Sequence, residues 1–218
     1  RKYDIPVKYR GNPLVDEIER KITSMPEKNK IIEILQLGSK PLITILPGSR
    51  KDEIRSMLPQ IIKIISDFPG YQFVIAGVRN IPEKLYTEIT GNAPVKIVND
   101  KTYELLKVSE AAIVKSGTST LETALFNIPQ VVCYKGDFFS MLIALILIKV
   151  KYVSLVNLIA GSEIVKELLG YKLNRKNLVK ELSLIIEGGP KRERMLSDYK
   201  ILMEKLGPAG ASGRIAGA

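Results

Sequence analysis

From Pro41 onward, short apolar runs alternate with segments of helical periodicity, and this alternation constrains the fold more than any other feature. It is typical of βαβ units, in which helices bury both faces of a parallel sheet. The expected fold class is therefore α/β, with a Rossmann-like parallel sheet and a C-terminal helical extension. The five expected strands are Leu42–Leu46, Gln72–Ala76, Val95–Val98, Ala111–Val114 and Gln130–Tyr134.

Between the expected strands, apolar residues recur at three- and four-residue spacing. Asp52–Ser66 places its apolar side chains on one helical face, which predicts an amphipathic helix covering the sheet. Gly117–Phe126 predicts another helix, with Thr118 or Ser119 near its start and Pro129 just past its end. The last third is predicted to form successive helices without a strand between them: Val165–Leu169, Lys176–Ile186 and Lys191–Leu206.

These patterns divide the 218 residues into four parts. Residues 1–38 contain the turn signal Gly11–Leu14 and are expected to form an interdomain connector. The sheet domain is expected to cover 39–160, the C-terminal helices 161–206, and a frayed tail rich in small residues 207–218. The first residues contain neither an initiator methionine nor the apolar core of a signal peptide, so we expect the interior of a longer gene product.

Histidine is absent, and the single cysteine, Cys133, lies in an apolar run. The absence of histidine excludes a Ser-His-Asp triad, a Cys-His pair and a histidine zinc site. A lone cysteine excludes a disulfide framework and predicts a buried strand thiol in a reducing compartment. Carboxylates such as Asp52, Glu53 and Glu163 show no metal-ligand spacing, so no metal site is predicted.

The formal net charge of +10 predicts an anionic partner: nucleic acid, nucleotide phosphates or an acidic membrane surface. Aromatic residues make up only 6% of the chain and do not interleave with basic residues, as base stacking would require. No nucleic-acid partner is therefore expected.

Leu46–Arg50 follows the first expected strand and precedes the first sheet helix. This position lies at the carboxyl edge of the sheet, where open α/β sheets bind their ligands. A guanidinium at Arg50 can offset the charge of a departing diphosphate, with Ser49 beside it. The alternative is an ordinary tight turn with an exposed arginine.

The segment Lys115–Glu122 joins the fourth expected strand to a helix that opens with Ser116, Gly117, Thr118 and Ser119. Free N–H groups and the positive end of a helix dipole attract anions, and glycine permits close approach. Glu122, one turn further on, can accept hydrogen bonds from ribose hydroxyls. The alternatives are an ordinary N-cap and a solvated first-turn acid, because this segment is neither a Walker A sequence nor GxGxxG.

Phe138–Val150 is almost wholly apolar but too short to span the roughly 30 Å hydrocarbon core of a bilayer. One interpretation is a core helix in the outer layer of the sheet. The other is a surface that rests on lipid, favoured by Lys149, Lys151 and the basic helices that follow.

Together these motifs resemble lipid-A-disaccharide synthase, a family of GT-B glycosyltransferases. The resemblance rests on Leu46–Arg50, on Ser116–Thr118 followed by Leu121 and Glu122, on Tyr152–Gly161 and on Val165–Leu169, and it extends from about residue 9 to 206. Gly11–Leu14 resembles the connector of the family. Two departures stand out: Val156 replaces a common proline, and Asn12 a frequent histidine.

The resemblance implies that this chain is the donor-binding half of a GT-B enzyme. Such an enzyme condenses UDP-2,3-diacylglucosamine with 2,3-diacylglucosamine 1-phosphate by an inverting transfer, without a metal or another cofactor. It implies that Arg50 and the segment from Lys115 to Ser119 stabilise the diphosphate, and that Glu122 holds ribose. Asn157 is expected to contact the donor nucleotide or sugar. The acceptor site and the catalytic base are expected in an N-terminal domain of the same protein, without which this chain would be inactive.

The acylated substrates would require a peripheral protein at the cytoplasmic face of the bacterial inner membrane. The expected membrane contacts are Phe138, Phe139, Leu142 and Ile146. Two alternatives remain open at this point. One is another UDP-sugar enzyme of the GT-B fold, such as a MurG-like transferase or an epimerase, and the other is a non-catalytic, membrane-associated nucleotide-binding module.

Overall fold

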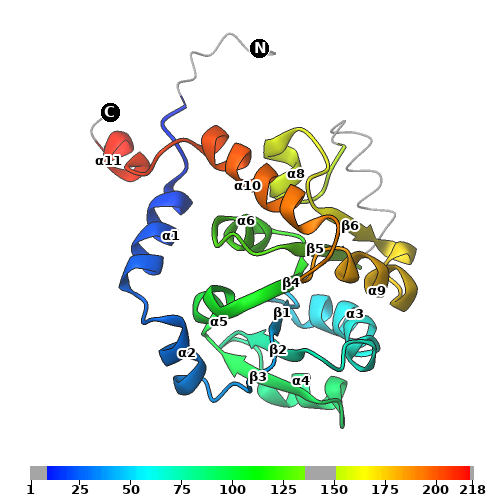
Figure 1. Cartoon of the computed structure of the whole chain (residues 1–218). Helices are drawn as coiled ribbons and strands as arrows, with labels where there is room; N and C mark the ends of the chain where they lie inside the picture. Colours follow the sequence, from blue (N-terminus) through cyan, green and yellow to red (C-terminus); the bar gives the residue numbers. More distant parts are fainter. Residues whose placement is uncertain (1–8, 136–150, 217–218) are drawn as a thin grey trace.

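The computed structural model describes residues 9–135 and 151–216 (Figure 1). Its centre is a parallel sheet of six strands in the order β3-β2-β1-β4-β5-β6. The order reverses between β1 and β4, as in doubly wound sheets. All five predicted strands are confirmed, and a sixth joins them: β1 (Leu42–Leu46), β2 (Gln72–Gly77), β3 (Val95–Asn99), β4 (Ser109–Lys115), β5 (Gln130–Tyr134) and β6 (Lys166–Leu169).

Helices cover both faces of the sheet (Figure 1). One face carries α3 (Lys51–Ile62), α4 (Glu83–Thr90) and α9 (Arg175–Ser183). The other carries α5 (Thr102–Val108), α6 (Thr118–Leu125), α8 (Leu155–Ala160) and α10 (Arg192–Leu206). Two short 3-10 helices, Ile65–Asp67 and Gly170–Lys172, complete the connections.

The apolar residues that predicted the strands form the core. Every residue of β1 is buried, and Ile45 lies in register with Ile75 of β2 and Ile113 of β4. The helix predicted over Asp52–Ser66 is confirmed as α3, although it ends at Ile62. Cys133 is fully buried in β5, which confirms the predicted strand thiol, and burial raises the pKa of that thiol.

The segment expected to be a connector contains α1 (Pro13–Ser24) and α2 (Lys28–Ile34). Asn12 caps α1, because its side chain accepts a hydrogen bond from the amide of Leu14, and Pro13 opens the helix. Helix α1 packs against α6 and α2 packs against α5. Residues 9–38 are thus part of the same body as the sheet, and their role between domains stays a prediction.

The prediction of a helix at Val165–Leu169, in a region 161–206 without strands, is wrong. Lys166–Leu169 forms β6, which pairs in parallel with β5 from Val131 to Tyr134. The acidic residue that obscured the strand pattern is Glu167, whose carboxylate is buried beneath the turn at residues 153–154. The sheet therefore continues past residue 160.

The prediction of a frayed tail over 207–218 is also wrong for its described part. Residues Ala211–Ala216 form α11, which packs against α1. The carboxylate of Asp16 accepts hydrogen bonds from the backbone amides of Gly210, Ala211 and Ser212. An acid on one helix thus satisfies the amides that open another.

The apolar segment Phe138–Val150, with Phe138, Phe139, Leu142 and Ile146, lies outside the described residues. Within residues 9–135 and 151–216, no helix has the length and hydropathy needed to cross a membrane.

Candidate functional site

The carboxyl ends of β1 and β4 lie side by side, and the chain leaves them toward opposite faces of the sheet (Figure 1). Open α/β sheets bind ligands at such a switch point. A cavity of about 780 Å³ is located here. Its lining includes the candidate residues Ser49, Arg50, Lys115, Ser116, Gly117, Thr118, Ser119 and Glu122.

The loop between β1 and α3 is shaped by Gly48 and Glu53. Gly48 has a φ of +106°, and a Cβ added there would lie 2.5 Å from Oε2 of Glu53. That oxygen accepts a hydrogen bond from the amide of Ser49 at 3.2 Å. Arg50 is the N-cap residue of α3; its side chain is 83% exposed, with Nη1 3.8 Å from Oε1 of Glu53. The guanidinium thus lies at the solvent-exposed rim of the cavity, within ion-pair distance of Glu53.

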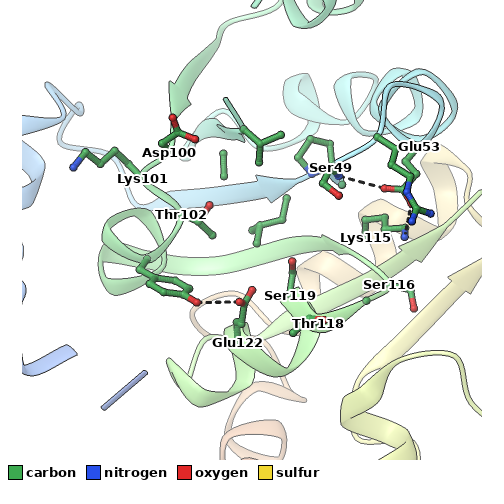
Figure 2. A pocket seen from close by; sticks show the side chains of 18 of the residues that line it. Ser49, Glu53, Asp100, Lys101, Thr102, Lys115, Ser116, Thr118, Ser119 and Glu122 are labelled. Carbon is green, nitrogen blue, oxygen red and sulfur yellow. Dashed lines mark hydrogen bonds and ion pairs between the residues drawn. The ribbon is translucent and has the colours of Figure 1, made fainter. Parts of the chain in front are cut away.

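The loop between β4 and α6 supplies a second cation and a helix start. Lys115 ends β4, and its ammonium lies 2.8 Å from Oε1 of Glu53 (Figure 2). Gly117 is the N-cap of α6, and a Cβ added there would meet nothing within 4 Å. The amides of Thr118 and Ser119, at the first two positions of α6, have no acceptor within the helix and border this space, whereas the amide of Thr120 donates to the carbonyl of Gly117 at 3.1 Å. The structure thus places a cation and a helix start together here, and their predicted role in binding an anion stays a prediction.

Ser116 lines the cavity, but its hydroxyl is used within the protein. It donates to the carbonyl of Val153 at 3.0 Å, and the residue is buried. The expected contribution of this hydroxyl to anion binding therefore reduces to fixing the position of the loop before Gly117.

The opposite wall is acidic and aromatic (Figure 2). The hydroxyl of Tyr103 donates to Oε1 of Glu122 at 3.0 Å. Burial raises the pKa of Glu122, and the charge of Glu17 raises it further, against the hydrogen bonds from Tyr103 and Ser119. Burial and the neighbouring Glu122 also raise the pKa of Tyr103. A carboxylate held in this way is a strong acceptor for hydroxyl groups of a ligand.

Sequence reasoning missed the part of the lining that follows β3. Asp100, Lys101 and Thr102 border the cavity (Figure 2). Asp100 has a φ of +56° and accepts hydrogen bonds from the amide and Nε of Arg79, both at 3.0 Å. Their signal was their place at the carboxyl end of a predicted strand. Glu17 and Lys21 of α1 also line the cavity, and no local pattern indicates the packing that brings them there.

This site stands in a chain with clear relatives. The sequence model described as "Lipid-A-disaccharide synthetase" matches residues 1–210. The chain belongs to the lipid-A-disaccharide synthase family.

Individual members of the family agree. The lipid-A-disaccharide synthase of Psychromonas ingrahamii is 33% identical over 94% of this chain and 54% of its own length. That of Persephonella marina is 33% identical over 96% and 57%, and that of Solibacter usitatus 30% identical over 99% and 57%. This chain therefore spans little more than half the length of these curated relatives.

Solved structures of low sequence identity share the fold. The UDP-GlcNAc 2-epimerase from Neisseria meningitidis, bound to UDP-GlcNAc, aligns with a TM-score of 0.63 at 18% identity, over 98% of this chain and 55% of that one. The S. aureus MnaA-UDP co-structure gives 0.63 at 16% identity, over 99% and 54%. The WaaG glycosyltransferase gives 0.55 at 11%, over 89% and 50%. The half-GT-B fold expected from the sequence is confirmed.

Asn157 was expected to contact the donor. Among the described residues of this lipid-A-disaccharide synthase family member, it is not one of those that line the cavity. It is fully buried. Its Nδ2 donates to the carbonyl of Val165 and to Oε1 of Glu167, both at 2.9 Å, and its Oδ1 accepts from the amides of Ile164 and Val165. With these bonds made, its side chain has no capacity left for a donor sugar, so we assign it an internal role.

Proposed function

We propose that this chain is the donor-binding half of a lipid-A-disaccharide synthase. The whole enzyme would condense UDP-2,3-diacylglucosamine with 2,3-diacylglucosamine 1-phosphate to lipid A disaccharide 1-phosphate and UDP. One observation carries the proposal beyond family membership. Two cations, a helix start and the half-buried carboxylate of Glu122 converge on one cavity at the switch point of the sheet.

The cationic wall would take the donor diphosphate. Arg50 and Lys115 supply positive charge, and the first amides of α6 supply donors. As the bond from the anomeric carbon to the diphosphate breaks, negative charge grows on the leaving group. Preorganised donors of this kind are worth about 3 kcal/mol each in transition-state stabilisation.

The acidic wall would take the ribose. Glu122 offers carboxylate oxygens to the hydroxyls of a ribose, with Tyr103 fixing its orientation at 3.0 Å. In the proposed inverting transfer, an acceptor hydroxyl attacks the anomeric carbon while UDP leaves. We assign the base and the acceptor site to the N-terminal domain of the full-length enzyme, because the relatives are nearly twice as long.

UDP titration by calorimetry tests the proposal. The chain should bind UDP, and Arg50→Ala and Lys115→Ala should each weaken binding about tenfold, the effect of losing one charge-assisted contact. Arg55→Ala is the matched control, because it removes the same charge from α3, the helix that Arg50 caps, at a position that does not line the cavity. Absence of UDP binding by the unmodified chain, or equal losses in all three variants, would reject the proposal.

We further propose that the protein acts peripherally at the cytoplasmic membrane surface. Support comes from the apolar run Phe138–Val150, the net charge of +10 and the acyl chains of the proposed substrates. Replacing Leu142 and Ile146 with glutamate should abolish flotation with liposomes that contain anionic lipids. Unchanged flotation of that double variant would reject the membrane contact.

A further inference from the structure

The carboxylate of Glu53 contacts three groups beside the start of α6: the ammonium of Lys115, the guanidinium of Arg50 and the amide of Ser49. Glu53 lies 2.8 Å from the ammonium of Lys115 and 3.8 Å from Nη1 of Arg50. Its other oxygen accepts the amide hydrogen bond of Ser49. Figure 2 shows Ser49, Glu53 and Lys115 gathered on one side of the cavity. A negative group of the protein thus occupies the place to which these groups would attract a phosphate.

We propose that Glu53 is a built-in competitor of the donor diphosphate, which neutralises Lys115 in the empty site and must release it when the nucleotide binds. This inference rests on the proposed function and adds a determinant of affinity to it. The role of the competition is to limit the affinity for UDP, so that the product leaves after transfer.

The ion pair between Lys115 and Glu53 is partly shielded from solvent. The side chain of Lys115 is 22% exposed and that of Glu53 19%, so solvent screens the pair less than an exposed surface pair. Burial alone would raise the pKa of Glu53, but the hydrogen bonds from Lys115 and Ser49 and the charges of Lys115 and Arg50 together outweigh it and lower that pKa. Glu53 therefore stays ionised at neutral pH and would repel a diphosphate bound beside it.

The geometry also gives the pair room to exchange partners. Lys115 and Glu53 border both the main cavity and a second cavity of about 450 Å³, to which Asp52, Tyr134 and Lys135 contribute. The ammonium of Lys115 lies 5.9 Å from the centre of the Tyr134 ring. The ammonium can therefore turn toward a phosphate in the main cavity while Glu53 turns away from it.

The variant Glu53→Gln distinguishes the effect of the negative charge of Glu53 from the effect of its hydrogen bonds. Its amide oxygen can still accept bonds from Ser49 and Lys115, but the negative charge is gone. Titrations with uridine, UMP and UDP should show unchanged uridine affinity, a modest gain for UMP and a gain of at least threefold for UDP. Stopped-flow measurements should place the UDP gain in a slower dissociation rate.

Asp52→Asn is the matched control. It makes the same change in net charge one residue away, but the Asp52 side chain is 99% exposed and does not line the main cavity. Its UDP affinity should equal that of the unmodified chain. Glu53→Ala, checked for folding by circular dichroism, should shift UDP affinity in the same direction as Glu53→Gln.

Each outcome decides a different point. Equal or weaker UDP binding by folded Glu53→Gln and Glu53→Ala would overturn the competition and make Glu53 a scaffold residue. An equal gain in Asp52→Asn would also overturn it, since the effect would then be one of net charge. No UDP binding by any protein, the unmodified chain included, would refute the proposed function and the competition with it.

Discussion

Two parts of the family pattern were predicted to contact the donor, the segment from Lys115 to Glu122 and the side chain of Asn157, and their surroundings in the structure differ. The segment from Lys115 to Glu122 opens onto the main cavity with an ammonium, helix amides and a carboxylate. The segment from Ser154 to Asn157 is buried, and its polar atoms bond to Glu167 and to neighbouring backbone groups. The side-chain amide of Asn157 already makes all its hydrogen bonds within the protein, whereas polar groups between Lys115 and Glu122 border the cavity and can bind a ligand.

The two segments are nevertheless connected. Glu167 accepts hydrogen bonds from the amides of Val153 and Ser154 and from the hydroxyl of Ser154 at 2.7 Å. The carbonyl of Val153 in turn accepts the bond from Ser116, directly before the start of α6. A buried polar network of this kind specifies one conformation when all its members are satisfied. The buried residues around Asn157 and Glu167 therefore help to fix the loop that precedes α6.

The largest expected effect separates these two roles. Asn157→Ala should lower the free energy of unfolding by about 3 kcal/mol, because it removes the four hydrogen bonds of a fully buried side chain, which join it to Ile164, Val165 and Glu167. Urea denaturation measures this change. Asn177→Ala, which removes an exposed amide bonded to Lys172, should cost less than about 1 kcal/mol.

The same variant tests the binding role of Asn157. Molecules of Asn157→Ala that remain folded should bind UDP with at most a small loss, since the network fixes Ser116 only indirectly. A variant of normal stability that no longer binds UDP would show that Asn157 contacts the donor, and the comparison between the segments would fail.

A smaller effect is expected within the open segment. Glu122→Gln should weaken UDP binding roughly fivefold, because an amide oxygen accepts hydrogen bonds less strongly than a carboxylate. Calorimetry at pH 8 measures this loss. Glu88→Gln, an exposed acid of α4, is the control and should leave UDP affinity unchanged.

Glu122→Gln should weaken UDP binding but make the folded protein more stable at pH 8. Because the pKa of Glu122 is raised in the folded protein, its contribution to stability is full below the unfolded value and is lost as pH rises through the folded value. The variant lacks this loss, so its melting temperature should exceed that of the unmodified chain at pH 8 and match it at pH 4. A lower melting temperature at pH 8 would show that the charged form of Glu122 stabilises the fold.

The sequence predicted most of the sheet, because buried parallel strands are continuous apolar runs and helices show a 3.6-residue period. It failed at β6, where Glu167 is buried by hydrogen bonds to a turn thirteen and fourteen residues earlier in the chain. Such a partner is set by tertiary structure. The local pattern therefore predicted a helix at Val165–Leu169.

The candidate site also contains residues that local sequence could predict and residues that depend on tertiary packing. The positions of Arg50, Gly117 and Glu122 could be predicted, because Arg50 and Gly117 cap the helices that follow β1 and β4, and Glu122 lies one turn inside the second of these helices. Asn157 has a polar side chain in a family motif, but whether its amide is free depends on Glu167 and Val165. Tyr103 and Glu17 reach the cavity from elements whose packing no local signal describes.

The smallest effect concerns Asp16, a buried carboxylate that, like Glu167, accepts hydrogen bonds from backbone amides. Hydrogen bonds from Ser212, opposed by burial and aided by Gly210 and Ala211, lower its pKa to about 2. Its stabilising contribution is therefore present above the unfolded value of 3.8 and is lost as pH falls through about 2. Asp16→Asn removes the charge but keeps one acceptor oxygen.

In Asp16→Asn, α11 should loosen while the sheet and the cavity remain as they are. Hydrogen exchange at the amides of Gly210 and Ser212 should accelerate at pH 7, and the melting temperature should fall by no more than about 3 °C. Acidifying the unmodified protein toward pH 2 should move its exchange toward that of the variant, because protonation of Asp16, whose pKa is about 2 in the folded protein, removes the same charge. UDP affinity should stay unchanged, since Asp16 does not line the main cavity. If exchange at Ser212 did not respond to the substitution, α11 would be held by packing against α1 and by the bonds of Arg214 to Pro208 and Ala209, without help from this carboxylate.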